Sequence, residues 1–166
     1  MNDEIQRLVV RYARKGILID TNILLLYFIG SFDQSLISSF KRTVQFTVED
    51  YNTLLLLLQM FDRLVTTPNI LTEVSSLSNQ LGQPARTSYF YTFAKQLALM
   101  EEHYVASREV AAEDEFIKMG LTDASILKLT KDHYLVLTDD FRLSQSLQHK
   151  EIDVINFNHI RPLGWS

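Results

Sequence analysis

The chain has 166 residues, of which 46% are hydrophobic and 22% charged, with 5 Gly and 3 Pro, which suits one well-packed domain and excludes collagen-like, proline-rich and low-complexity proteins. Because the sequence contains no cysteine, disulfide frameworks, thiolate zinc sites, iron–sulfur clusters and cysteine nucleophiles are excluded. The formal net charge of −4 does not indicate a broad basic face for nucleic acid.

The amino-terminal third predicts helix, strand, helix and helix. Residues 2–14 place apolar side chains at helical spacing, which predicts an additional amphipathic helix within residues 1–15. The apolar run 17–19 is typical of a buried parallel strand, and polar residues interrupt it before the apolar run 23–29. We expect the latter run to form a helix that Thr21 or Asn22 caps and Gly30 closes, followed by a short helix over residues 32–40.

The rest of the chain alternates helices and strands. In chain order we expect a helix over 47–61 that opens with a capping box, a strand over 64–67, a helix over 69–80, a helix over 87–102, a strand over 104–106, a helix from Ser107 to Gly120, a helix from Thr122 to 131, a strand over 134–137, a helix over 140–149 and a strand over 152–155. This alternation predicts a three-layer α/β/α sandwich around a mostly parallel, roughly five-stranded sheet, in one domain over residues 1–166.

The amino terminus lacks the basic start of a signal peptide. The longest apolar run, residues 23–29, is far shorter than the about 20 residues that a membrane-spanning helix needs. We therefore expect a cytoplasmic protein without a membrane partner.

Four acidic residues are expected at one edge of the sheet. Asp20 and Asp140 directly follow predicted strands, whereas Glu73 and Asp123 lie near the starts of predicted helices. In a doubly wound sheet these positions meet beyond the carboxyl ends of the strands. Like charges brought together there repel unless a hard cation neutralises them, so we expect Mg²⁺ or Mn²⁺. Such a cluster suits metal-assisted chemistry on a phosphodiester.

Four ordered motifs resemble those of the PIN-domain ribonucleases, and together they span about residues 16–157. The motifs are Asp20-Thr21-Asn22 after an apolar strand, Thr67-Pro68-x-x-Leu71-Thr72-Glu73-Val74, Gly120-Leu121-Thr122-Asp123-Ala124 and Leu137-Thr138-Asp139-Asp140-x-x-Leu143. The resemblance implies the α/β/α fold and the cleavage of single-stranded RNA by a metal-activated water.

The same resemblance implies roles for individual residues. The catalytic, metal-binding carboxylates would be the four acids Asp20, Glu73, Asp123 and Asp140. Thr138 and Asn22 would be polar groups behind these ligands. Asp139 is grouped with them, although it could equally be a helix cap, a fifth carboxylate or a surface residue.

Each acid also has a structural explanation of its own. Asp20, Asp123 and Asp140 have the positions of helix caps, and Glu73 that of an acid stabilised by a helix dipole. Four caps need not fall at one sheet edge, however, and their conjunction favours a metal site. Beyond the acids, Arg142 lies one helical turn from Asp140, which makes it the best candidate for orienting a phosphate.

We therefore expect a Mg²⁺- or Mn²⁺-dependent endoribonuclease that acts on RNA. The alternatives are an inactive PIN-like binding or scaffold module, a toxin of a toxin–antitoxin pair and a flap-type DNA nuclease. The helix within residues 1–15 and the helical segments between 32 and 61 make the chain longer than the small PIN toxins. A homodimer and an antitoxin-like protein are further partners that the sequence leaves open.

Overall fold

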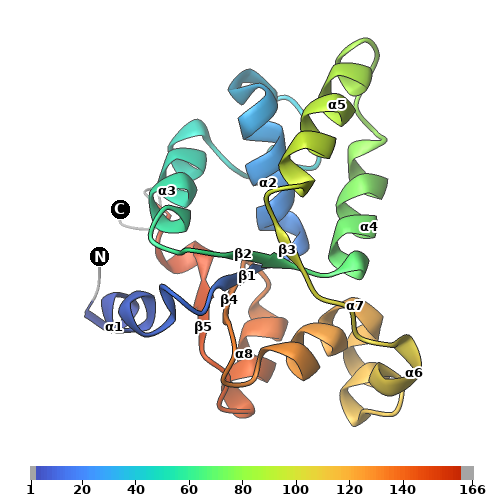
Figure 1. Cartoon of the computed structure of the whole chain (residues 1–166). Helices are drawn as coiled ribbons and strands as arrows, with labels where there is room; N and C mark the ends of the chain where they lie inside the picture. Colours follow the sequence, from blue (N-terminus) through green and yellow to red (C-terminus); the bar gives the residue numbers. More distant parts are fainter. Residues whose placement is uncertain (1–2, 162–166) are drawn as a thin grey trace.

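A five-stranded parallel sheet forms the centre of residues 3–161, which are the residues that the computed structural model describes (Figure 1). The strands are β1 (Ile17–Ile19), β2 (Leu64–Thr66), β3 (Glu101–Glu102), β4 (Leu135–Thr138) and β5 (Val154–Asn156). Their order is β3-β2-β1-β4-β5, and every neighbouring pair is parallel. All residues of the central strand β1 are 0% exposed, as expected of a strand covered on both faces.

Helices cover both faces of the sheet, which confirms the predicted three-layer α/β/α architecture. In Figure 1 one face carries α2 (Thr21–Phe32), α3 (Val48–Leu58), α4 (Pro68–Ser78) and α5 (Ala85–Leu97). The other face carries α7 (Asp114–Thr130) and α8 (Phe141–His149), with α6 (Ser107–Val110) beside α7, and α1 (Asp3–Tyr12) lies at the side of the sheet near β5. Two short 3₁₀ helices, η1 (Gln34–Leu36) and η2 (Phe157–His159), complete the described elements. Within residues 3–161, no helix is long and apolar enough to cross a membrane.

Local sequence signals explain several helix starts. The side chain of Thr47 accepts a hydrogen bond from the amide of Asp50, and the carboxylate of Asp50 accepts one from the amide of Thr47, so the predicted capping box is present. Pro68 occupies the start of α4, where its missing N–H costs nothing. Thr67 caps this helix through a hydrogen bond from the amide of Ile70.

Three expectations in the first half of the chain are wrong. The N-cap of α2 is Asp20 rather than Thr21 or Asn22, because the carboxylate of Asp20 accepts a hydrogen bond from the amide of Thr21. Gly30 does not close α2, which continues to Phe32 with Asp33 as its C-cap. Glycine is needed at this position because the ring of Tyr51 packs where a Cβ atom would lie. The helix predicted over residues 32–40 is reduced to the 3₁₀ helix η1 and turns, and its start is set by the side chain of Asp33, which accepts a hydrogen bond from the amide of Ser35.

The edge strand lies earlier than predicted. Residues 104–106 are not a strand; β3 is Glu101–Glu102 and pairs with Val65 and Thr66. Because α5 ends at Leu97 rather than near residue 102, the chain reaches the sheet sooner. An edge strand is open to solvent on one side, so it does not require the apolar residues on which the prediction relied.

Gly120 divides α7, as the sequence predicted, but the predicted caps around it are wrong. Its φ of 81° and ψ of −177° are non-helical, and only glycine adopts this conformation without strain. Ser107 is the first residue of α6 rather than its cap, and a non-helical segment separates α6 from α7. Thr122 does not cap the second half of α7, because its hydroxyl binds a side chain of α4 instead.

Candidate active site

The four predicted carboxylates line one cleft at the carboxyl ends of β1 and β4. Asp20 directly follows β1, Asp140 follows β4 after one residue, Glu73 lies in α4, and Asp123 lies in the second half of α7. They border a cavity of about 440 Å³ together with Thr21, Asn22 and the segment from Met119 to Thr122. The parallel topology thus brings together residues that are far apart in the sequence, as the strand-end argument predicted.

Asp20 is the buried, fixed member of the cluster. Its side chain is almost enclosed, since the residue is 7% exposed. Oδ1 accepts a hydrogen bond of 2.7 Å from the amide of Thr21, and Oδ2 accepts one of 2.6 Å from the hydroxyl of Thr138. Burial raises the pKa of Asp20 to about 6, although both hydrogen bonds oppose this shift.

Thr138 links two of the carboxylate-bearing segments. Besides donating to Asp20, its Oγ1 accepts a hydrogen bond of 3.0 Å from the amide of Asp140. The residue is fully buried at the end of β4. The polar supporting position that the resemblance implied for Thr138 therefore has a physical basis, because one hydroxyl orients both acidic segments.

Glu73 is held by two threonine hydroxyls. Thr21 donates to its Oε2 over 2.9 Å, and Thr122 donates to its Oε1 over 2.5 Å. Sequence reasoning missed both contacts, since it regarded these threonines as candidate helix caps. The available signal was that each threonine adjoins a candidate acid, at Asp20 and Asp123.

Asp140 is both a helix cap and a member of the cluster. Its Oδ1 accepts hydrogen bonds from the amides of Arg142 and Leu143, at 2.7 and 3.1 Å, which starts α8. Within the described part of the chain, its Oδ2 has no hydrogen-bond partner, and the residue lines the cleft. The two explanations considered for this residue are thus compatible.

Asp123 differs from the other three acids because its carboxylate has no hydrogen bond or ion pair within residues 3–161. It does not cap α7. Burial raises its pKa to about 7, and the charges of Asp20, Asp140 and Glu73 add to this effect, whereas Arg142 opposes it. Burial and then like-charge repulsion thus both disfavour the ionised form of Asp123, the acid that no hydrogen bond of the described chain holds.

Asp139 lies beside the cleft rather than among its lining residues. Asn22 donates through Nδ2 to both carboxylate oxygens of Asp139, over 3.3 and 3.4 Å, and Asn158 donates to its backbone carbonyl over 2.9 Å. Burial raises the pKa of Asp139. Asn22 itself borders the cleft, so it connects this fifth acid to the site.

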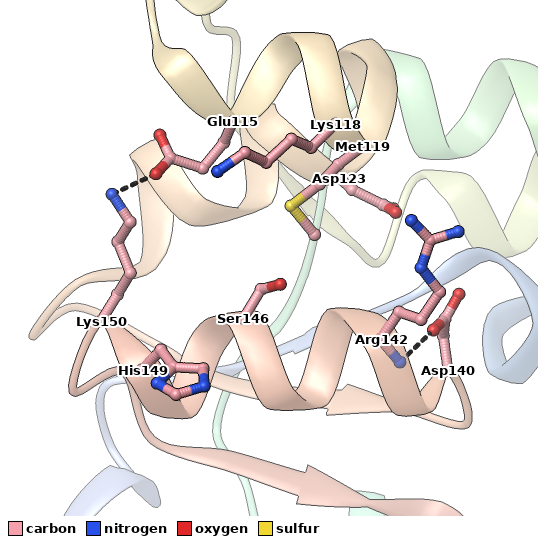
Figure 2. Close-up of a pocket in the computed structure, with 9 residues that line it drawn as sticks. All are labelled: Glu115, Lys118, Met119, Asp123, Asp140, Arg142, Ser146, His149 and Lys150. Atoms are coloured by element: carbon pink, nitrogen blue, oxygen red, sulfur yellow. Dashed lines mark hydrogen bonds and ion pairs between the residues drawn. The ribbon is translucent and has the colours of Figure 1, made fainter.

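Arg142 projects from α8 toward Asp123, as Figure 2 shows. Its guanidinium is close enough to lower the pKa of Asp123 but forms no hydrogen bond or ion pair with any described residue. It lines a second hollow, between α7 and α8, that shares Asp123 and Asp140 with the carboxylate cleft. Arg142 therefore lies beside the acidic cluster, where its sequence position one helical turn from Asp140 placed it.

The donor set fits a hard divalent cation in chemistry, but it is not preassembled. Among residues 3–161, no three or more His, Asp or Glu side chains are arranged so that they could hold a metal ion as they stand. All four acids offer oxygen ligands, and those of Asp123 are free to turn toward a cation. Mg²⁺ keeps several of its waters in proteins, so it needs few direct protein ligands.

No model of a known protein family matches the sequence. No curated protein sequence matches it either.

Proposed function

We propose that this protein is a Mg²⁺- or Mn²⁺-dependent endoribonuclease of PIN type that hydrolyses phosphodiester bonds in single-stranded RNA. One observation carries the proposal. Four carboxylates from four separate elements border the same cleft, and the least restrained of them, Asp123, has its pKa raised to about 7 by burial and by the other three. A site that concentrates negative charge in this way is suited to a cation.

Helix capping does not account for this arrangement. Asp20 and Asp140 do cap α2 and α8, but Glu73 and Asp123 cap nothing. Converging uncompensated carboxylates cost stability, and proteins retain such costs mainly at functional sites. The four motifs that resemble PIN ribonucleases are also the segments that supply these acids, which supports the same conclusion.

Asp20, Asp123 and Asp140 would hold the cation, and Glu73 would face it from α4. When bound, it supplies an activated water and positive charge against the charge that develops on the phosphodiester. Thr138 and the amide of Thr21 fix the orientation of Asp20.

Glu73 is fixed in the same way by its two threonine partners. Asp123 can rotate toward the ligand, since no hydrogen bond in the described chain holds it. The guanidinium of Arg142, which has no hydrogen bond or ion pair with a described residue, would orient a phosphate beside the carboxylates.

The test is incubation of the purified protein with end-labelled single-stranded RNA and with DNA of the same sequence, each with Mn²⁺, with Mg²⁺ and with chelator. We expect internal cleavage of RNA that requires metal. Metal-dependent cleavage of DNA alone would favour a flap-type nuclease. RNA binding without cleavage under any condition would favour an inactive binding module.

A toxin–antitoxin partnership and a homodimer remain predictions from the sequence. Both are accessible to the same preparation. Size-exclusion chromatography with light scattering would give its mass in solution, and co-expression with the neighbouring reading frame would reveal an antitoxin-like protein if it inhibits cleavage.

A further inference from the structure

A second hollow lies between α7 and α8 and continues from the acidic cleft. Its volume is about 650 Å³, within the about 300–1,000 Å³ typical of ligand sites. Asp123 and Asp140 form one end, where it meets the carboxylate cleft. The ion pair between Glu115 and Lys150 closes the opposite end, as Figure 2 shows. We call this hollow the α7–α8 groove.

Helical spacing accounts for the walls of the groove. On α8, Arg142, Ser146 and His149 are four and three residues apart, so they share one face of the helix. On α7, Lys118 and Met119 precede the break at Gly120, and their side chains project toward the space above α8 (Figure 2).

Within residues 3–161, a cation without an ion pair lies toward each end of the groove, Arg142 beside the acidic cleft and Lys118 toward Glu115 (Figure 2). Lys118 and Arg142 come from opposite walls, and within the described residues neither side chain has a hydrogen bond or an ion pair. The hydroxyl of Ser146 and the ring of His149 are also without hydrogen-bond partners in this part of the chain. Lys150, in contrast, is neutralised by Glu115. Two cations without an ion pair in the described chain, beside two polar groups, are suited to phosphate and sugar oxygens.

The dimensions of the groove suit a chain rather than a single phosphate. Arg142 and His149 are seven residues apart, which is about 10 Å along a helix axis. A stacked strand advances about 3.4 Å per nucleotide, so this length matches about three nucleotides. Met119 lies between the two ends and offers a thioether for contact with a sugar or a base.

We propose that the α7–α8 groove holds the sugar–phosphate backbone of the RNA strand that leads away from the scissile bond, with Arg142 on a phosphate near the acidic cleft and Lys118 on a phosphate farther along the strand. The identity of the strand as RNA rests on the proposed nuclease function. The groove itself is defined by its cations and its continuity with the acidic cleft. Because it is bounded by two helices of one chain, it admits one strand and favours single-stranded over duplex nucleic acid.

The test is fluorescence anisotropy of a labelled uridine decamer, titrated with protein in chelator at several salt concentrations. In Lys118→Gln we expect the slope of log affinity against log salt to fall by about 0.7, the value for one phosphate contact on a single strand. The same contact makes the affinity about fivefold weaker at 0.1 M salt. Lys118→Arg should restore the wild-type slope. Lys118 is exposed, and thermal unfolding would confirm that both variants fold.

Lys95→Gln is the matched control, since Lys95 is an exposed lysine of α5 without a hydrogen bond or ion pair in the described chain. It should keep the wild-type slope. The proposal is overturned if Lys118→Gln and Lys95→Gln give the same slope, if the wild-type protein does not bind the decamer, or if duplex RNA binds more tightly. If Lys118→Gln loses the same slope with single-stranded DNA as with RNA, the result supports the groove, because the proposed contacts are to phosphates.

This result is separable from that of the proposed function, because binding in chelator requires no cleavage. A slope loss in a protein that never cleaves RNA would support the groove and contradict the nuclease. Metal-dependent cleavage, combined with an unchanged slope in Lys118→Gln, would support the nuclease and overturn the groove.

Discussion

Replacing Asp123 by asparagine should stabilise the metal-free protein. The substitution preserves shape and removes no hydrogen bond of the described chain, because the carboxylate of Asp123 has none. It does remove a negative charge that burial and three nearby acids disfavour. Loss of a helix cap would have the opposite sign and cost about 1 kcal/mol.

The magnitude follows from the pKa. A rise from 3.8 to about 7 is about 3 units, and at 1.36 kcal/mol per unit the ionised carboxylate would cost the folded state about 4 kcal/mol. The cleft is open to solvent, which screens part of this penalty. We therefore expect Asp123→Asn to raise the free energy of unfolding by about 1–2 kcal/mol at pH 8.

The raised pKa of Asp123 also determines how the stability of the protein changes with pH. At pH values well below the ordinary pKa of 3.8, Asp123 is protonated in both the folded and the unfolded state and contributes no difference. Between about 4 and about 7 the unfolded chain loses this proton first, so the stability of the wild-type protein falls as pH rises. The advantage of Asp123→Asn should therefore be smaller at pH 5 than at pH 8.

The assay is urea or thermal unfolding of both proteins in chelator and in millimolar Mn²⁺, at each pH. Asp62→Asn provides a control at an exposed acid and should change little. A cation that binds the folded state adds about 2.7 kcal/mol at a hundredfold excess over its Kd, and this gain should shrink in Asp123→Asn. If Asp123→Asn is less stable in chelator and neither protein responds to Mn²⁺, the reasoning is refuted.

Three further predictions concern single side chains. Thr138→Val removes the hydroxyl that donates to the carboxylate of Asp20, so it should raise the pKa of Asp20 further and lower the free energy of unfolding by about 1–3 kcal/mol. The acidic limb of the pH profile of cleavage should then move to higher pH, whereas Thr138→Ser should retain the wild-type profile. Arg142→Ala should lower the salt dependence of RNA binding by about one contact, whereas Arg7→Ala on α1 should do much less, and equal effects would place the RNA elsewhere. Gly30→Ala should lower the free energy of unfolding by about 1–3 kcal/mol, because the added methyl group would meet the ring of Tyr51. Gly82→Ala adds a methyl group in open space and should leave the unfolding midpoint unchanged, so equal midpoints for the two variants would contradict this packing.

The sheet could be predicted from the sequence because its signals are local. The strands predicted over residues 17–19 and 64–67 correspond to β1 and, apart from the last residue, to β2. The edge strand Glu101–Glu102 could not be found in this way, since solvent exposure relaxes its composition. Gly30 likewise has the sequence signature of a helix end, but it lies inside α2 and is required by a tertiary contact, the ring of Tyr51.

The convergence of the acids was predictable from topology, but their individual environments were not. The strand-end positions of Asp20 and Asp140 follow from the chain pattern alone. In the described chain Glu73 is held by two threonines and Asp123 by no hydrogen bond. This difference depends on how α4 and α7 pack, which the spacing of apolar residues does not reveal. The α7–α8 groove was missed for the same reason, because Lys118 reads in the sequence as an ordinary solvated lysine.

The most direct test of the metal-dependent nuclease site is the single-turnover rate of RNA cleavage by wild-type protein and by Asp20→Asn across a Mn²⁺ titration. Asp20 is the most buried of the four acids and is fixed by two hydrogen bonds. We expect wild-type cleavage that requires Mn²⁺, and a rate lower by at least about 100-fold in Asp20→Asn at limiting metal. Equal rates for the two proteins, or wild-type cleavage that persists in chelator, would contradict the account.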